Sequence, residues 1–246
     1  MKLRRALTAV AATAVLPLAL AACSSGGSDR PSSDASAGHK GSSDSAGGPD
    51  AGLLNGTRLK AALLPVGELP KGYKADPHAT RDSGTAFAPA SSKAKAPLDL
   101  AGACPKLEAS AWIQTAGLES AAFAQGDFEN ASQEEFNQEV DSFRGKDAQT
   151  VMLRLGQVLR HCAHFTDKSN GTTAAVTIKT ATVPKMGDQT LKAVLTAPEW
   201  EGGTTLVASR VGNAVVTTFY NVQSNDKGAA GLDLTKKIVA QVQKAK

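Results

Sequence analysis

The sequence predicts an α+β protein, a single domain in which an antiparallel β-meander packs against helices and carries one disulfide. Residues 174–221 show a two-residue hydrophobic period, which is typical of strands, and turn-rich stretches divide them into four runs. Residues 147–165 and 232–243 instead repeat their apolar side chains every three to four positions, as helices do. The domain contains two cysteines, Cys104 and Cys162, enough for one disulfide, because the third, Cys23, lies near the N-terminus.

The first 22 residues predict a secretory signal peptide. A basic start precedes an apolar run over residues 6–22. The run is rich in alanine and contains a proline, so it is a poor membrane span, which needs about 20 strongly apolar residues. It ends in Leu20-Ala21-Ala22-Cys23, which resembles the lipobox of bacterial lipoproteins. The resemblance implies cleavage before Cys23, a diacylglyceryl group on its thiol, and palmitate as part of the lipid anchor. The alternative is ordinary Ala-x-Ala cleavage beside an unrelated cysteine.

Residues 23–51 predict a lipidated, disordered tether. The stretch consists almost entirely of Ser, Gly, Ala, Asp and Pro, without a large apolar side chain. Such a segment cannot bury enough surface to offset its ordering entropy. We therefore expect a signal peptide at 1–22, the tether at 23–51 and an extracellular domain at 52–246.

The charge balance argues against a nucleic-acid partner. The chain has 27 basic and 23 acidic residues, but three of the basic ones lie in the signal peptide. The mature chain therefore keeps 24 basic and 23 acidic groups. Nucleic-acid binding needs a clustered basic face, and this near-neutral balance gives no sign of one.

The N-terminal half of the domain predicts short elements. Residues 57–64 should form a helix capped by Thr57, and 65–73 are rich in turn residues. We expect a mobile surface loop at residues 81–97. A helical turn should start at Pro105, and residues 118–128 should form a strand.

Residues 132–143 predict a helix. Ser132–Glu135 match a capping box, and Phe136, Val140 and Phe143 follow at i, i+4 and i+7.

The clearest helix is expected at 147–165, and its apolar face includes Cys162. That residue can then meet Cys104, because an even pair of cysteines in an exported domain favours a disulfide. The bridge would stabilise the fold by about 4 kcal/mol in the chain-entropy model. The alternative is a pair of buried free thiols.

Four strands are predicted at Ala174–Val183, Thr190–Ala197, Thr204–Val211 and Ala214–Asn221. Gly212-Asn213 between the last two is the strongest local signal, a two-residue hairpin turn.

A final helix is expected at Leu232–Gln243, with Leu234, Ile238 and Val242 on one stripe. We expect the helices to cover one side of the sheet.

Several short motifs over roughly residues 53–244 carry a family resemblance. They are 63–73 (Leu-Leu-Pro to Gly-Tyr), 104–107 (Cys-Pro-x-Leu), 162–165 (Cys-Ala-His-Phe), 184–188 (Pro-Lys-Met-Gly-Asp) and 210–216 (Arg-Val-Gly-Asn-Ala-Val-Val), followed by the C-terminal helix. Together they resemble the PknH-type extracellular sensor domain of actinobacteria. The resemblance implies a mixed α/β domain with a cleft for a ligand. Family members of the kinase type carry two disulfides, whereas this domain has cysteines for one, and it has no kinase.

Candidate chemistry is sparse. His161 and His164 have a spacing that could present two metal ligands, but helix-terminal histidines are the simpler explanation. Ser92 and Lys95 match Ser-x-x-Lys within a low-complexity stretch. The remaining candidates are two carboxylate pairs, Glu134/Glu135 and Asp127/Glu129. We expect no catalytic residue, no metal and no cofactor, and the sequence does not identify ligand-binding residues.

The leading functional hypothesis is a non-catalytic lipoprotein on the extracytoplasmic face of the cell membrane. Its partners would be the membrane, through the diacylglyceryl anchor, and a small molecule or an envelope protein. Two alternatives are a carrier of a lipid or other apolar molecule, and an envelope hydrolase.

Overall fold

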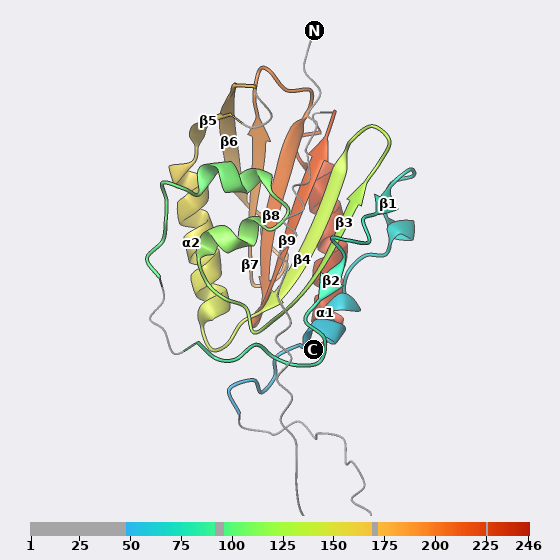
Figure 1. The fold of residues 1–246 in the computed structure, drawn as a ribbon, viewed down its shortest axis with the longest axis vertical. Helices are drawn as coiled ribbons and strands as arrows, with labels where there is room; N and C mark the ends of the chain where they lie inside the picture. Colours follow the sequence, from blue (N-terminus) through green and yellow to red (C-terminus); the bar gives the residue numbers. More distant parts are fainter. Residues whose placement is uncertain (1–47, 92–95, 169–171, 225) are drawn as a thin grey trace, which may run out of the picture.

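A nine-stranded antiparallel sheet forms the centre of the fold (Figure 1). The computed structural model describes residues 48–91, 96–168, 172–224 and 226–246. The strand order is β1-β3-β4-β9-β8-β7-β6-β5, and β2 also pairs with β3. The strands are β1 (Lys74–Ala75), β2 (Arg81–Asp82), β3 (Ala122–Glu129), β4 (Glu135–Ser142), β5 (His164–Asp167), β6 (Ala174–Thr182), β7 (Gln189–Thr196), β8 (Gly203–Val211) and β9 (Ala214–Val222). The helices are α1 (Gly56–Lys60), η1 (Val66–Glu68), η2 (Cys104–Glu108), η3 (Trp112–Ala116), α2 (Asp147–His161) and α3 (Ala229–Lys244), where η marks 3-10 helices. The α+β class and the antiparallel meander are confirmed.

The meander β6–β9 follows the prediction to within one residue at each end. Its alternating apolar side chains fix the register, because a one-residue slip would turn them to the other face. At the β8–β9 turn, Gly212 has a φ of 55°, a backbone conformation that glycine adopts at low cost. The Gly-Asn signal therefore marked the correct turn.

The predicted helix over 132–143 is wrong, because β4 occupies Glu135–Ser142 and pairs with both β3 and β9. A spacing of four positions suits one face of a strand as well as one face of a helix. Phe136 and Val140 indeed share a face of β4. Phe143 has the opposite parity and packs against the other face of the sheet. The supposed capping box lies in the turn before β4, where Asn130 accepts hydrogen bonds from the backbone of Ser132 and Glu134.

Other expected boundaries also move. Helix α2 ends at His161 instead of Phe165, and the chain turns back into the edge strand β5. Helix α1 is capped by the side chain of Asn55, not Thr57, and ends at Lys60. The expected surface loop over 81–97 begins with β2, which pairs with β3.

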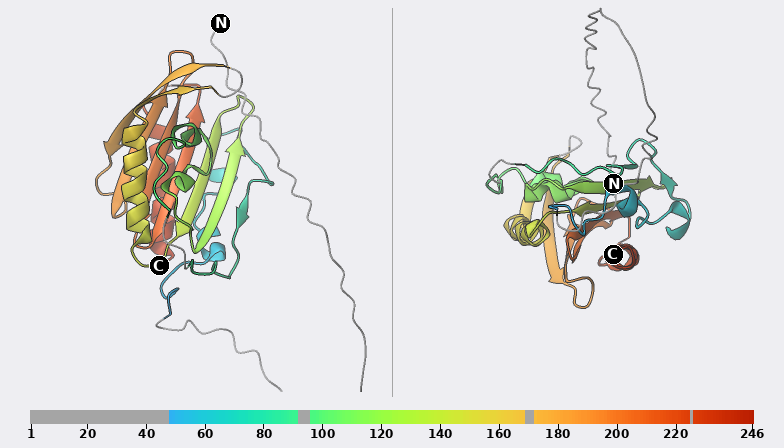
Figure 2. Two further views of the ribbon diagram at one scale, coloured as in Figure 1. Left: turned by 60° about the vertical axis from the view of Figure 1, so that its left-hand side comes forward. Right: turned by 90° about the horizontal axis from the view of Figure 1, so that it is seen from below.

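Helices cover both faces of the sheet, so the expectation of helices on one side is wrong. Helix α2 and η3 pack with Leu206 and Phe219 on one face. Helix α3 packs with Val207 and Tyr220 on the other. Figure 2, viewed from below, shows α3 and the green segment with η2 and η3 on opposite sides of the sheet. Strand β9 is buried along its whole length, because both of its faces are covered.

The predicted disulfide between Cys104 and Cys162 is present and joins η2 to the end of α2. It fixes the 104–116 segment over the sheet. Within the described part of the chain, no helix has the length and apolar character that a membrane crossing needs. The predicted signal peptide, Cys23 and nearly all of the predicted tether lie outside the described residues. Asp50, near the end of the predicted tether, pairs with Arg144 at 2.6 Å.

Candidate ligand-binding cleft

A cleft of about 530 Å³ opens over one face of β3 and β4. Phe123, Glu139 and Asp141 lie on its strand side. Ile113 and Gln114 of η3 contribute on one side, and Arg81 and Ser83 from the β2 segment contribute on another. The remaining lining residues are Ala88, Leu118, Glu119, Ser120, Ala121, Ala122 and Phe143. A volume of this size is in the range of small-molecule sites.

The alternation of β4 places the acidic side chains in this cleft. Successive residues of a strand point to opposite faces. Phe136 and Val140 pack into the core beneath the sheet, and Gln138 there bonds both backbone polar groups of Leu64. Glu139 and Asp141 therefore lie on the opposite face.

The register of the neighbouring strands completes the polar surface. Gln125 of β3 and Thr217 of β9 lie opposite Glu139, and Phe123 lies opposite Asp141. Asp127 has the same parity as Gln125 and so faces the same side. This face thus contains the buried carboxyl groups of Glu139 and Asp141 and the partly buried one of Asp127.

Burial shifts the protonation of these carboxyl groups. Desolvation raises the pKa of Glu139 far above its usual range, and the charge of nearby Asp141 raises it further. Desolvation also raises the pKa of Asp141, although a hydrogen bond with Ser120 offsets part of the change. The pKa of Asp127 rises to about 6, again mainly because its charged form loses hydration. These groups therefore hold protons at a pH where exposed carboxyls are ionised.

One oxygen of each of these carboxyl groups has no hydrogen-bond partner: Asp127 Oδ1, Glu139 Oε2 and Asp141 Oδ2. Buried polar atoms are almost always paired, and an unpaired one destabilises a protein by about 1–3 kcal/mol. A surface that keeps three such atoms together is suited to binding a polar molecule.

Arg81 supplies a positive charge beside these acids. Its guanidinium carbon lies 5.7 Å from the centre of the Phe123 ring, and its Nε donates to Gln125 Oε1 at 3.3 Å. Its charge lowers the pKa of both Glu139 and Asp127, which partly opposes the effect of burial. The guanidinium therefore lies over an aromatic ring and close enough to the two carboxyl groups to affect their protonation.

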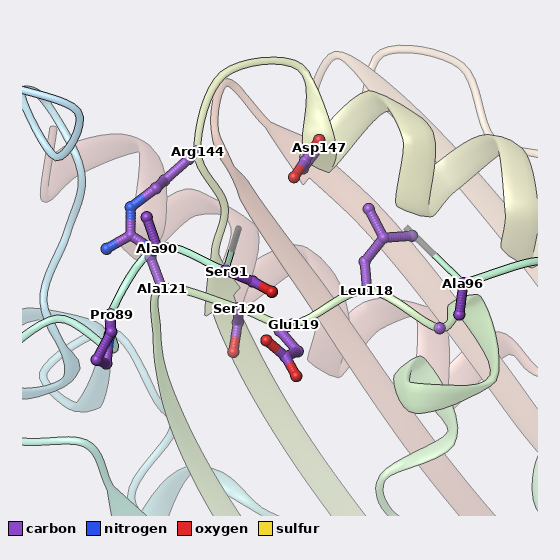
Figure 3. Close-up of a pocket in the computed structure, with 11 residues that line it drawn as sticks. Pro89, Ala90, Ser91, Ala96, Leu118, Glu119, Ser120, Ala121, Arg144 and Asp147 are labelled. Carbon is purple, nitrogen blue, oxygen red and sulfur yellow. The ribbon is translucent and has the colours of Figure 1, made fainter. Parts of the chain in front are cut away.

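A second pocket of about 370 Å³ shares the segment Leu118–Ala121 with the cleft. Figure 3 shows Glu119 and Ser120 on this segment, with Arg144 and Asp147 drawn from the chain beyond β4. Arg144 donates to the backbone oxygen of Ala88 and pairs with Asp50. These contacts hold the loop after β2 in place beside the cleft.

The described residues singled out in the sequence do not line this cleft, although Asp127 lies on the same side of the sheet. His161 ends α2 and His164 begins β5, and the described residues contain no group of three or more His, Cys, Asp or Glu suited to a metal. Glu134 caps the β3–β4 turn and bonds the backbone of Gln223. Ser92 and Lys95 lie outside the described residues.

Asp127 lies with Glu139, across the β3–β4 pair, instead of with its predicted partner Glu129, which is exposed. Glu139 and Asp141 were missed because residues 132–143 were interpreted as a helix. The alternation of Asn137, Glu139 and Asp141 with Phe136, Gln138 and Val140 was the signal that could have identified them.

No family model matches the sequence, and a search of curated proteins finds no significant match. The fold is similar to a solved structure, the extracellular domain of PknH from Mycobacterium tuberculosis. The TM-score is 0.59 at 19% sequence identity, and the match covers 78% of this chain and 98% of the PknH domain. The resemblance noted in the sequence is thus confirmed at the level of the fold.

The likeness to the PknH domain extends over nearly all of that domain. The part of the present chain that it leaves out, about a fifth, is comparable in size to the predicted signal peptide and tether. At this level of identity the likeness concerns the fold, so the argument for a ligand site rests on the cleft of the present chain.

Proposed function

We propose that this protein is a lipid-anchored, extracytoplasmic protein whose domain binds a small ligand without catalysing a reaction, in the manner of a sensor. The observation that carries the proposal is the cleft over β3 and β4, where buried carboxyl oxygens lack partners that a ligand could supply. The lipobox-like segment ending at Cys23 supports the anchor, and the fold it shares with an extracellular domain supports the location.

The carrier alternative has less support. A carrier would need an apolar cavity between the meander and its helices. Large apolar side chains fill these two interfaces, Leu155 and Leu206 on the α2 side and Ile238 and Val207 on the α3 side. All four are fully buried.

Native mass spectrometry of the full-length protein, extracted from its host in detergent, tests ligand binding. We expect a discrete additional mass that is lost on denaturation. The control variant Glu129→Gln, which removes an exposed carboxylate of β3, should keep that additional mass. A bare protein, together with no thermal shift across a small-molecule panel, would contradict the proposal and favour a protein partner. Hydrolysis of an envelope substrate that is lost in Glu139→Gln would favour the enzyme alternative.

Metabolic labelling with an alkyne fatty acid tests the anchor. Wild-type protein should be labelled and membrane-bound, and Cys23→Ala should be neither. The double variant Cys104→Ala/Cys162→Ala should still be labelled, since only Cys23 follows the lipobox pattern. Acylation that persists in Cys23→Ala would refute the anchor.

A further inference from the structure

Carboxyl groups outnumber basic groups along the cleft. Glu119, Glu139 and Asp141 line it, and Asp127 lies on the same side of the sheet. Among the described residues lining the cleft, the basic one is Arg81. An anionic ligand would therefore meet three carboxyl groups for one guanidinium.

Two of these acids are buried, line the cleft and share a side-chain hydrogen bond, and each keeps one oxygen without a partner. Glu139 is 6% exposed and Asp141 is 4% exposed, and both line the cleft. Glu139 Oε2 and Asp141 Oδ2 accept no hydrogen bond from the protein. The two residues are separated by one position on β4, so their side chains lie on the same face. A ligand that donates several hydrogen bonds from one atom could satisfy both oxygens.

The chemistry of the donors selects the ligand class. A primary ammonium group has three N–H donors, no acceptor and a positive charge. Charged hydrogen bonds to carboxylates are shorter and stronger than neutral ones. A metal ion is less suitable, because no group of three or more His, Cys, Asp or Glu that could hold one occurs within the described ranges. The guanidinium of Arg81 already places an organic cation over Phe123, close enough to lower the pKa of Glu139.

We propose that the cleft binds a small organic cation, with a primary ammonium group between the carboxyl groups of Glu139 and Asp141. This inference rests on the proposed ligand-binding function and specifies the class of ligand. The volume of about 530 Å³ accommodates an alkyl diamine or polyamine, and the aliphatic part would contact Ile113 and Leu118.

Binding of such a cation should release protons. An ammonium group favours the charged form of a neighbouring carboxyl, so it lowers the raised pKa values of Glu139 and Asp141. The charged or titratable groups that face this pair are Asp127 from β3, Arg81 from β2 and Glu119 from the segment before β3. Gln114 of η3 and Thr217 of β9 face it without titrating. Affinity should therefore increase as the pH rises from 6 to 8.

Isothermal titration of the full-length protein in detergent tests the proposal with ethylamine, putrescine and spermidine as probes. The neutral 1,4-butanediol and the anionic succinate, which have a similar chain length, are the matched control ligands. We expect binding of at least one amine, no binding of the diol or succinate, and proton release seen as a dependence of the heat on the buffer. Failure of all three amines to bind would overturn the proposal, and so would binding of succinate that Arg81→Gln abolishes.

Three variants separate the roles of the cleft charges. Glu139→Gln should weaken amine binding about 10-fold or more, since a hydrogen bond to a charged group is lost. Arg81→Gln should strengthen it several-fold because a competing cation is removed. Glu129→Gln, on the same strand as Asp127 but exposed, should change it less than about twofold. Thermal melts establish that each variant is folded, and unchanged affinity in folded Glu139→Gln would refute the assigned site.

The two proposals fail in distinguishable ways. If mass spectrometry shows that the native protein releases a neutral or anionic molecule, the proposal of ligand binding would stand and the proposal of a cationic ligand would be refuted. A bare protein that binds no amine would refute both.

Discussion

Removal of the Cys104–Cys162 disulfide should destabilise the domain by a calculable amount. The bridge joins residues 58 positions apart, and the chain-entropy model gives about 4 kcal/mol for a loop of that length. Domains are stable by about 5–15 kcal/mol in total, so this is a large fraction. The double variant Cys104→Ala/Cys162→Ala should lower the urea midpoint by about 2 M, for a slope of about 2 kcal/mol per M.

Equilibrium urea unfolding, followed by tryptophan fluorescence, measures the effect. Trp112 reports on the relevant region because it is buried in η3, between the bridge and the sheet. The wild-type protein in reducing agent should unfold at nearly the same midpoint as the double variant. The double variant itself should not respond to the reducing agent. A loss below about 1 kcal/mol would refute the reasoning, and would mean that the unbridged chain keeps the two segments together in its unfolded state.

Two further measurements test the turn geometry and the buried acids. Gly202→Ala should destabilise the fold by about 3 kcal/mol or more, because Gly202 has a φ of 74° and an added Cβ would collide with the backbone oxygen of Val222. Gly67→Ala, where an added Cβ meets nothing within 4 Å, should stay within about 0.5 kcal/mol, and equal losses in the two variants would contradict this explanation. The free energy of unfolding should fall by about 2 kcal/mol or more between pH 5 and 8. Folding raises the pKa of these acids, so their contribution to stability is fully present below the pKa of the unfolded chain. That contribution is lost as the pH rises through the pKa in the folded protein, which is about 6 for Asp127 and higher for Glu139. The pKa of Asp82 is lowered, so its titration changes the free energy of unfolding below pH 4 and not between pH 5 and 8. Urea titrations at several pH values should give a flatter profile for Glu139→Gln than for wild type and an unchanged one for Glu129→Gln, whereas a wild-type profile that rises with pH would disprove the assignment.

The C-terminal half of the fold could be predicted because its sequence signals are local and agree with one another. In β6–β9 the alternating apolar residues, the β-branched side chains and the Gly212-Asn213 turn all indicate a meander. Helix α3 shows its three apolar residues on one stripe, and the structure buries all three.

The cleft could not be predicted in the same way because it depends on a register between distant strands. Glu139 lies near Asp127 and Thr217 only because β4 pairs with β3 on one side and β9 on the other. The apolar spacing within 135–142 fits a helix and a strand equally, and the buried acids lower the hydrophobic contrast on which strand patterns depend. The sequence also could not predict which face of the sheet α2 and α3 pack against. An amphipathic pattern identifies the apolar face of a helix but not the face of the sheet that this helix contacts.

The pairing of β4 with β9 has a consequence for the order in which the molecule can be completed. Glu135 pairs with Asn221, so the strand that carries the cleft acids gains its second neighbour from near the end of the chain. Contacts of such long sequence separation form late, because the loop-closure entropy must be overcome first. In a chain threaded through a translocation channel from its N-terminus, as the proposed signal peptide implies, residues 122–142 emerge long before 214–222 follow. The ligand site would thus exist only after the last strand has crossed, which ties binding to complete export of the chain.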